Sequence, residues 1–220
     1  KRGTRIPLQH LTGEQEFFGY PFLVNEHVLI PRQDTEILVE EVMRELHDGM
    51  HILDLCTGSG CILLSLLRYS NDCQGTGSDL SEKALIVARE NARRLSLEAS
   101  FVQGDLFENI TGRFEVIVSN PPYIRHSEIA SLMEEVREHD PMMALDGGED
   151  GLDFYRAISE KWKAALAPGG RLYFEVGIGQ ADAVLRIMRA QGFGDIQVVK
   201  DHNDIPRVVF GTLCGEVYSE

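Results

Sequence analysis

Residues 51–69 read HILDLCTGSGCILLSLLRY, and three consecutive signals of secondary structure lie within them. An apolar strand over residues 51–55 runs into a turn that contains Gly58 and Gly60, and a helix begins at Cys61. Glycine suits a tight strand–helix turn, because it adopts positive φ angles and lets other groups approach the backbone. The stretch therefore predicts an α/β fold, with the glycine turn at the carboxyl end of a buried strand.

The same alternation of strands and amphipathic helices continues along the chain. Further strands are expected at residues 74–79, 99–103, 114–119, 171–176, 196–200 and 208–213, and helices at about 34–47, 81–95, 153–166 and 180–190. Asp34 and Ser81 are the expected helix caps, and Pro168-Gly169-Gly170 is the expected helix stop. Because no helix separates the last two strands, these two should pair antiparallel, whereas the others should form a parallel sheet covered on both faces.

A smaller β element is expected before this sheet. Residues 14–32 alternate apolar and polar side chains around Gly19-Tyr20-Pro21 and Asn25-Glu26, a pattern typical of a β-hairpin. We therefore predict an α/β fold with a mostly parallel seven-stranded sheet, a C-terminal antiparallel hairpin and a small N-terminal hairpin. The expected division is a linker with the hairpin at residues 1–33 and one large domain at residues 34–220.

The composition is that of a globular chain. Its 220 residues are 43% apolar and 25% charged, which excludes disordered, collagen-like and coiled-coil classes. No window of about 18 apolar residues exists, and no apolar run follows the basic residues near the start, so neither a membrane span nor a secretory signal is predicted. We therefore expect a monomer in the cytoplasm. The start at Lys1 rather than at a methionine indicates a fragment or a processed chain.

The net charge of −14 argues against nucleic acid as a partner, because the surface field repels phosphates. Half of this charge lies in residues 134–153, which hold eight acidic residues and one basic residue, Arg137. Such a run is either a solvated acidic face or a docking surface for a basic protein partner.

The four cysteines, Cys56, Cys61, Cys73 and Cys214, form no C-x-x-C motif and no metal-ligand pattern with the seven histidines. A structural zinc or other metal site is therefore not expected. Free thiols in a reducing compartment are the expectation.

Acidic residues at the ends of successive strands indicate a nucleoside site beside the glycine turn. Asp54 ends the first strand and Asp79 follows 25 residues later, near the spacing at which a carboxylate binds ribose hydroxyls in this architecture. Asp105 ends the next strand and could face an adenine amino group. The alternative is structural, with glycines that serve packing and with Asp79 stabilising the N-terminus of the helix at Ser81.

The turn does not suit NAD, because Leu63 occupies the position of the third glycine in a G-x-G-x-x-G motif. A nucleoside ligand without phosphates fits better, and S-adenosylmethionine is the predicted cofactor.

Asn120-Pro121-Pro122-Tyr123 follows an apolar strand at the same edge of the sheet. The prolines remove two backbone donors, so the turn offers carbonyl acceptors, an Asn120 amide oxygen and the flat face of Tyr123. A planar NH₂ group could donate one hydrogen to Asn120 and the other to the Pro121 carbonyl. In the structural alternative the motif is only a rigid turn with an Asn cap, as in a non-catalytic nucleoside-binding module.

This motif, together with the turn at Asp54–Gly60, resembles class I S-adenosylmethionine-dependent methyltransferases that act on planar amino or amide nitrogens. Over nearly the whole chain the sequence is similar to the HemK/PrmC family of release-factor glutamine N5-methyltransferases. The stretches that carry this resemblance are Pro7–Gly13, Glu16-Phe17, Val28–Glu36, Ile52–Gly60, Ser119–Ile124 and Ala144–Tyr155.

The resemblance implies a Rossmann-like fold and methyl transfer to the glutamine of the Gly-Gly-Gln motif in class 1 release factors, without direct binding of nucleic acid or membrane. The implied substrate-binding and catalytic residues are Asn120, Pro121, Pro122 and Tyr123. The predicted cofactor contacts are Asp54, Cys56, Thr57, Gly58, Ser59, Gly60, Asp79, Leu80, Asp105, Leu106 and Asn120. Glu175, Arg32 and Glu36 are either supporting residues of the site or anchors of the hairpin.

Two other substrates remain open, a glutamine of a ribosomal protein and, against the net charge, an adenine of a nucleic acid. Three positions depart from the family pattern: Cys56 replaces a frequent glycine, Gln33 a frequent proline, and Asp140-Pro141 a frequent Glu-Pro. The family also has an N-terminal helical domain that helps to engage the release factor, and we expect this chain to begin just after that domain.

Overall fold

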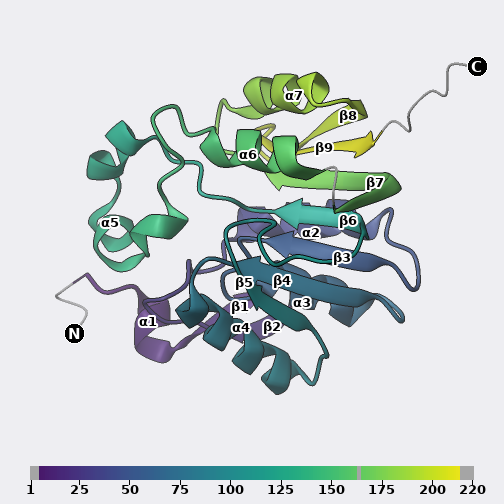
Figure 1. The fold of residues 1–220 in the computed structure, drawn as a ribbon. Helices are drawn as coiled ribbons and strands as arrows, with labels where there is room; N and C mark the ends of the chain where they lie inside the picture. Colours follow the sequence, from purple (N-terminus) through teal and green to yellow (C-terminus); the bar gives the residue numbers. More distant parts are fainter. Residues whose placement is uncertain (1–4, 163–164, 214–220) are drawn as a thin grey trace, which may run out of the picture.

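A seven-stranded sheet lies at the centre of the computed structural model, which describes residues 5–162 and 165–213 (Figure 1). Its strands are β3 (His51–Leu55), β4 (Gln74–Asp79), β5 (Ser100–Gln103), β6 (Phe114–Ser119), β7 (Leu166–Glu175), β8 (Phe193–Lys200) and β9 (Pro206–Leu213). In space they follow the order β5-β4-β3-β6-β7-β9-β8, and β9 alone runs in the direction opposite to the other six strands. The predicted mostly parallel sheet with an antiparallel C-terminal hairpin is confirmed.

Helices cover both faces of this sheet, because successive apolar residues of a strand point to opposite faces. On β3, Ile52 belongs to one hydrophobic cluster with α2 (Glu36–Met43) and α3 (Cys61–Tyr69), and Leu53 belongs to a second cluster with α6 (Asp153–Lys161) and α7 (Ala181–Ala190). Figure 1 shows α6 and α7 on one side of the sheet and α3 and α4 (Glu82–Leu95) on the other.

The N-terminal hairpin packs into the first of these clusters. β1 (Glu14–Phe17) and β2 (Tyr20–Leu23) pair antiparallel after the short helix α1 (Leu8–Thr12). Phe17 and Phe22 are fully buried against α2 and α3, and Glu36 Oε1 accepts a hydrogen bond of 2.8 Å from the Phe18 amide. The hairpin predicted within residues 14–32 is confirmed at residues 14–23, and residues 24–32 contain no strand.

The helix predicted at residues 34–47 begins differently and is shorter. A 3-10 turn, η2 (Gln33–Thr35), leads into α2, which ends at Met43. Asp34 does not act as the predicted cap, because its carboxylate instead forms an ion pair of 2.8 Å with Arg207 of β9. The expectation for Ser81 is confirmed, since its Oγ accepts a hydrogen bond of 3.2 Å from the Ala84 amide in the first turn of α4.

The Pro168-Gly169-Gly170 stop does not end a helix. α6 ends at Lys161, before residues 163–164, which lie outside the described residues, and β7 begins at Leu166. Leu166 pairs with Phe114 and Arg171 pairs with Val116, so three extra residues bulge out of β7 between these pairs. Proline has no N–H to donate to a ladder and glycine accepts the φ of +74° at Gly169, so this tripeptide suits a bulge within a strand.

Three short elements between β6 and α6 were not predicted. They are η3 (His126–Ser131), α5 (Glu134–His139) and η4 (Met142–Ala144), each too short to show a helical period. Figure 1 shows this segment beyond the sheet edge at which the parallel strands end. Residues 126–144, here called the lid segment, therefore lie beside the predicted site.

Cys56, Cys61 and Cys73 are free thiols, and Cys214 lies outside the described residues. Among the described residues no helix has the length and apolar character needed to cross a membrane. Within the same part of the chain no three His, Cys, Asp or Glu side chains gather as potential metal ligands.

Candidate active site

A cavity of about 490 Å³ opens where β3 and β6 end and the strand order reverses. This is the place at which open α/β sheets bind their ligands. Ten predicted site residues line it: Cys56, Thr57, Gly58, Ser59, Asp79, Leu80, Asp105, Leu106, Asn120 and Pro122. Within the described part of the chain, four other predicted site residues do not line the cavity: Asp54, Gly60, Pro121 and Tyr123.

The glycine turn is held from behind by Asp54. Its carboxylate is fully buried and accepts a hydrogen bond of 2.6 Å from the Thr57 hydroxyl. Thr57 N donates to the Ser78 carbonyl at 3.0 Å, and Gly60 N donates to the Thr57 carbonyl at 2.8 Å. Burial raises the pKa of Asp54 to about 7, partly offset by the Thr57 hydrogen bond. In the structure, Asp54 positions the turn whose other residues face the cavity.

Asp79 joins the glycine turn to the start of α4. Its Oδ2 accepts a hydrogen bond of 2.9 Å from Gly58 N, and its Oδ1 accepts one of 2.9 Å from Ser81 N. Burial raises the pKa of this carboxyl, and the two backbone donors oppose the shift. Each oxygen of a carboxylate has two acceptor positions, so Asp79 can still accept hydrogen bonds from a ligand in the cavity.

The adjacent loop after β5 contributes Asp105 and Leu106 to the same cavity. Leu106 has a φ of +54°, and its carbonyl accepts a hydrogen bond of 3.0 Å from the buried Ser78 hydroxyl. This bond fixes an unusual backbone conformation beside the cavity. Cys56 also has a positive φ, +59°, and burial raises the pKa of its thiol, so the thiol stays protonated at neutral pH.

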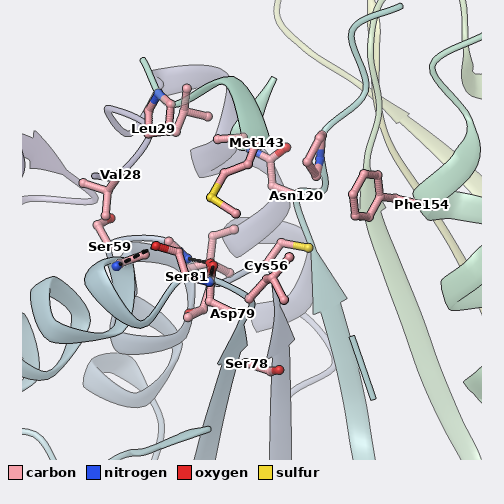
Figure 2. Close-up of a pocket in the computed structure, with 18 of the residues that line it drawn as sticks. Val28, Leu29, Cys56, Ser59, Ser78, Asp79, Ser81, Asn120, Met143 and Phe154 are labelled. Carbon is pink, nitrogen blue, oxygen red and sulfur yellow. Dashed lines mark hydrogen bonds between the residues drawn. The ribbon is translucent and has the colours of Figure 1, made fainter. Parts of the chain in front are cut away.

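The Asn-Pro-Pro-Tyr turn lies on the other side of the cavity from Asp79 (Figure 2). Asn120 Nδ2 donates a hydrogen bond of 3.4 Å to Thr35 Oγ1. The Tyr123 hydroxyl donates one of 3.5 Å to Glu175 Oε1, and burial raises the pKa of this tyrosine. The structure thus brings Asn120 and Asp79 to one cavity and directs the Tyr123 hydroxyl into the protein.

Gln180 supports this turn and was not predicted. Its side chain donates to the Tyr123 carbonyl at 2.8 Å and to the Gly151 carbonyl at 3.2 Å, and accepts from Gly177 N at 3.0 Å. A lone glutamine before a helix carries no sequence signal for such a role, so only the fold reveals it.

Glycines of the Ala144–Tyr155 stretch pack directly against the same turn. A Cβ at Gly147 would lie 2.7 Å from Tyr123 Cα and 2.8 Å from the Pro122 carbonyl oxygen. A Cβ at Gly151 would lie 2.4 Å from the Tyr123 carbonyl oxygen. Glycine is therefore required at these two positions, because the two backbone segments approach each other closely.

The lid segment closes part of the cavity. Met143 lines it, and Figure 2 shows the thioether of Met143 pointing into the space between Asn120 and Asp79. Arg32, which also lines the cavity, forms an ion pair of 2.9 Å with the buried carboxylate of Asp140. A carboxylate at position 140 thus links the lid segment to the residues before α2.

Comparisons with known proteins show the family of this chain. The family described as "Methyltransferase small domain" matches residues 32–149. The release factor glutamine methyltransferase of Geobacter sulfurreducens is 45% identical and covers 97% of this chain and 75% of its own length. The protein of the same name from Clostridium acetobutylicum is 43% identical and covers 97% of this chain and 78% of its own length. The chain belongs to the release factor glutamine methyltransferase family.

Solved structures agree with this membership. A release-factor-specific protein-(glutamine-N5) methyltransferase from Alicyclobacillus acidocaldarius is 32% identical, with a TM-score of 0.53 over 87% of this chain and 98% of its own. A methyltransferase from Pyrococcus furiosus, 18% identical, shares the fold with a TM-score of 0.70 over 96% of this chain and 97% of its own. The predicted family and the class of enzyme, a protein methyltransferase, are confirmed.

Proposed function

We propose that this release factor glutamine methyltransferase family member transfers a methyl group from S-adenosylmethionine to the side-chain nitrogen N5 of the glutamine in the Gly-Gly-Gln motif of class 1 release factors. The observation that carries the proposal is the position of Asn120 and Pro122 in the cavity that also contains Asp79. In this proposal the turn binds the amide and the Asp79 carboxylate binds the nucleoside, on opposite sides of a single cavity.

The cavity residues fit S-adenosylmethionine as the cofactor. Asp79 offers free acceptor positions for both ribose hydroxyls, while the backbone of Gly58 and Ser81 already neutralises part of its charge. In the proposed arrangement Asp105 and Leu106, which line the cavity, contact the adenine, and the turn at residues 56–59 contacts the methionine part. When bound, the cofactor supplies an activated sulfonium methyl group.

The protein's own part is to orient and polarise a weak nucleophile. An amide nitrogen shares its lone pair with the carbonyl, as a rotation barrier of about 18–20 kcal/mol shows. In the proposed arrangement Asn120 Oδ1 and the Pro121 carbonyl accept the two N–H bonds, and the Tyr123 ring packs on the amide plane. These acceptors stabilise positive charge on nitrogen during transfer, most strongly in a dry site. The methylated amide is then a strong acid, so no dedicated base is needed before transfer.

The proposed partner is the release factor itself, met in the cytoplasm. Nucleic acid is disfavoured as substrate by the net charge of −14. The side-chain amide of a glutamine and the amino group of an adenine are both planar NH₂ groups, so the turn alone does not distinguish them.

Labelled S-adenosylmethionine tests the proposal. The chain is offered a class 1 release factor, the same factor with the motif Gln→Ala, a ribosomal protein fraction and adenine-containing DNA. We expect label on the first substrate alone. Label on the Gln→Ala factor or on DNA would contradict the proposed site of methylation, and label on a ribosomal protein alone would move the function to that substrate.

A further inference from the structure

A buried carboxylate lies behind the Asn-Pro-Pro-Tyr turn. Glu175 ends β7, the strand next to β6, and is 3% exposed. Burial of a carboxylate is unfavourable unless hydrogen bonds and charges compensate it. Its partners therefore indicate what the residue does.

Two of these partners belong to the amide-binding side of the cavity. The Tyr123 hydroxyl donates to Glu175 Oε1 at 3.5 Å. The Thr35 side chain also favours the ionised form of Glu175. The buried Glu175 Oε2 accepts no hydrogen bond from the described residues, so it is the acceptor left for the Thr35 proton. Thr35 is itself 2% exposed and accepts the hydrogen bond from Asn120 Nδ2 at 3.4 Å. Glu175, Thr35 and Asn120 thus follow one another from the sheet to the cavity.

The number of protons available decides which of these three side chains donates a hydrogen bond and which accepts one. A threonine hydroxyl has a single proton. When Thr35 donates that proton to the ionised Glu175, its oxygen faces Asn120 as an acceptor, and the Asn120 NH₂ group must turn towards it. The Asn120 amide oxygen then points the other way, which is the orientation needed to accept a hydrogen bond from a substrate N–H.

We propose that Glu175 is a positioning residue that fixes the orientation of the Asn120 amide through Thr35 and of the Tyr123 ring through its hydroxyl. The proposal rests on the proposed function, because it takes Asn120 as the acceptor for the glutamine amide. Glu175 touches neither substrate nor cofactor in this assignment. Its effect is on turnover rather than on cofactor binding.

The electrostatic surroundings agree with a group that can lose this role by protonation. Burial raises the pKa of Glu175 to about 7, and the charged or titratable groups that act on it are Asp34 of η2, Tyr123 and Arg207 of β9. Tyr155 of α6 and Cys61 of α3 also face it. A protonated Glu175 is a donor, so Thr35 can then accept from it and donate to Asn120, which reverses the Asn120 amide.

Glu175→Gln tests this directly, because glutamine has the same shape but can accept a hydrogen bond from only one of Thr35 and Tyr123, at every pH. We expect the kcat for methyl transfer to fall at least tenfold while the dissociation constant for S-adenosylmethionine changes less than twofold. We also expect wild-type kcat to rise between pH 6 and pH 8, and that of Glu175→Gln to be flat.

Thr35 supplies a second, independent measurement that holds even if Glu175→Gln folds poorly. Thr35→Val removes the hydroxyl and should lower kcat to a similar extent, and Thr35→Ser should recover most of that rate. The double variant Thr35→Val with Glu175→Gln should lose little more than either single change. Glu41→Gln is the matched control, because Glu41 is also buried but lies on α2 outside the cavity lining.

The possible outcomes separate the positioning role of Glu175 from the proposed function. If the wild type methylates the release factor and Glu175→Gln keeps its kcat and pH profile, the positioning role is wrong and the proposed function stands. An equal loss in Glu175→Gln and Glu41→Gln would also overturn it. If the wild type methylates no glutamine, both the proposed function and the positioning role fail.

Discussion

Asn120 and Asp79 lie in one cavity but are expected to serve different parts of the reaction. Asn120→Ala removes the proposed acceptor for the substrate amide, and the loss of one preorganised hydrogen bond in a dry site costs about 10²–10³ in turnover. We therefore expect kcat to fall by about a hundredfold while S-adenosylmethionine affinity changes little. Turnover kinetics and calorimetric titration measure the two effects. Equal losses in both would contradict the assignment.

Asp79→Asn should give the opposite separation. The wild-type carboxylate accepts one backbone N–H at each oxygen, from Gly58 and from Ser81. An asparagine can accept only one of these and presents its own NH₂ to the other donor. We expect the dissociation constant for the cofactor to rise at least tenfold, with a smaller loss of kcat at saturating cofactor. Unchanged affinity would exclude Asp79 from the nucleoside site.

The raised pKa of Asp54 predicts how the free energy of unfolding depends on pH. Its pKa is raised from 3.8 to about 7 in the folded protein, so the folded state binds this proton more tightly than the unfolded chain does. The stability gained in this way is complete below pH 3.8 and is lost as the pH rises through about 7. Asp54→Asn has no such loss and can still accept the Thr57 hydroxyl.

We therefore expect Asp54→Asn to melt higher than the wild type at pH 8, by several degrees, and the difference to shrink towards pH 5.5. Thermal unfolding of the ligand-free proteins across this range measures it. A difference that grows as the pH falls would show that the carboxylate is stabilised, not destabilised, by its surroundings.

At the scale of single residues, sequence patterns located side chains that end strands. Asp79, Asp105 and Asn120 were predicted because the carboxyl ends of parallel strands meet at one edge of the sheet. Thr35 and Gln180 were not predicted, because their roles depend on contacts with residues 85 and 57 positions away in the chain. No local pattern encodes such contacts.

At the scale of elements, the packing of the 144–155 stretch against the Asn-Pro-Pro-Tyr turn leaves no space for a side chain. A Cβ at Gly147 would meet backbone atoms of Pro122 and Tyr123, which cannot move without shifting the turn. We expect Gly147→Ala to lower the methyl-transfer rate at least tenfold, because small displacements of a positioned group are costly. Rates at saturating substrates measure it.

Gly170→Ala is the matched control. Its Cβ would also meet backbone atoms, 2.9 Å from the Ala167 carbonyl oxygen and 3.0 Å from the Glu115 carbonyl oxygen, at the bulge of β7 outside the cavity lining. We expect a comparable loss of melting temperature in both variants and a loss of rate in Gly147→Ala alone. Equal rates in the two variants would show that the close approach serves only stability.

The long periodic elements were the predictable ones. The helices at α3, α4 and α7 and the apolar strands appear within a few residues of their predicted limits. The lid segment was missed because its elements are short. Asp34 and Pro168-Gly169-Gly170 were misassigned because an ion pair with β9 and a bulge in β7 outweigh the local preferences for a cap and a stop.

For the whole molecule, the acidic run at residues 134–153 is less available to a partner than its charge indicates. Five of its eight acids form ion pairs with arginines within the described part of the chain, and a sixth, Asp146, forms a hydrogen bond with His126. The ion pairs join Glu134 to Arg5, Glu138 to Arg137, Asp140 to Arg32, and Asp150 and Asp153 to Arg156. The run therefore resembles a self-paired surface more than a free anionic patch.

Charge reversal of Glu134, Glu135 and Glu138 to Lys separates the two interpretations. A solvated, self-paired surface predicts methyl transfer within about twofold of the wild type at sub-saturating release factor, since exposed ion pairs contribute little. A docking surface predicts a large loss of kcat/KM in the variant. It also predicts that added salt lowers the kcat/KM of the wild type. The same measurement at two ionic strengths distinguishes these outcomes.

The place of β9 in the sheet has a consequence for folding during translation. Because β9 lies between β7 and β8, a strand that the ribosome makes after both of them fills the gap between the two. Until residues 206–213 emerge, β7 presents an open edge with the large apolar side chains of Tyr173 and Phe174. Nascent chains that stall or terminate before this point are therefore expected to aggregate or to be degraded. The fate of the nascent protein thus depends on whether translation reaches β9.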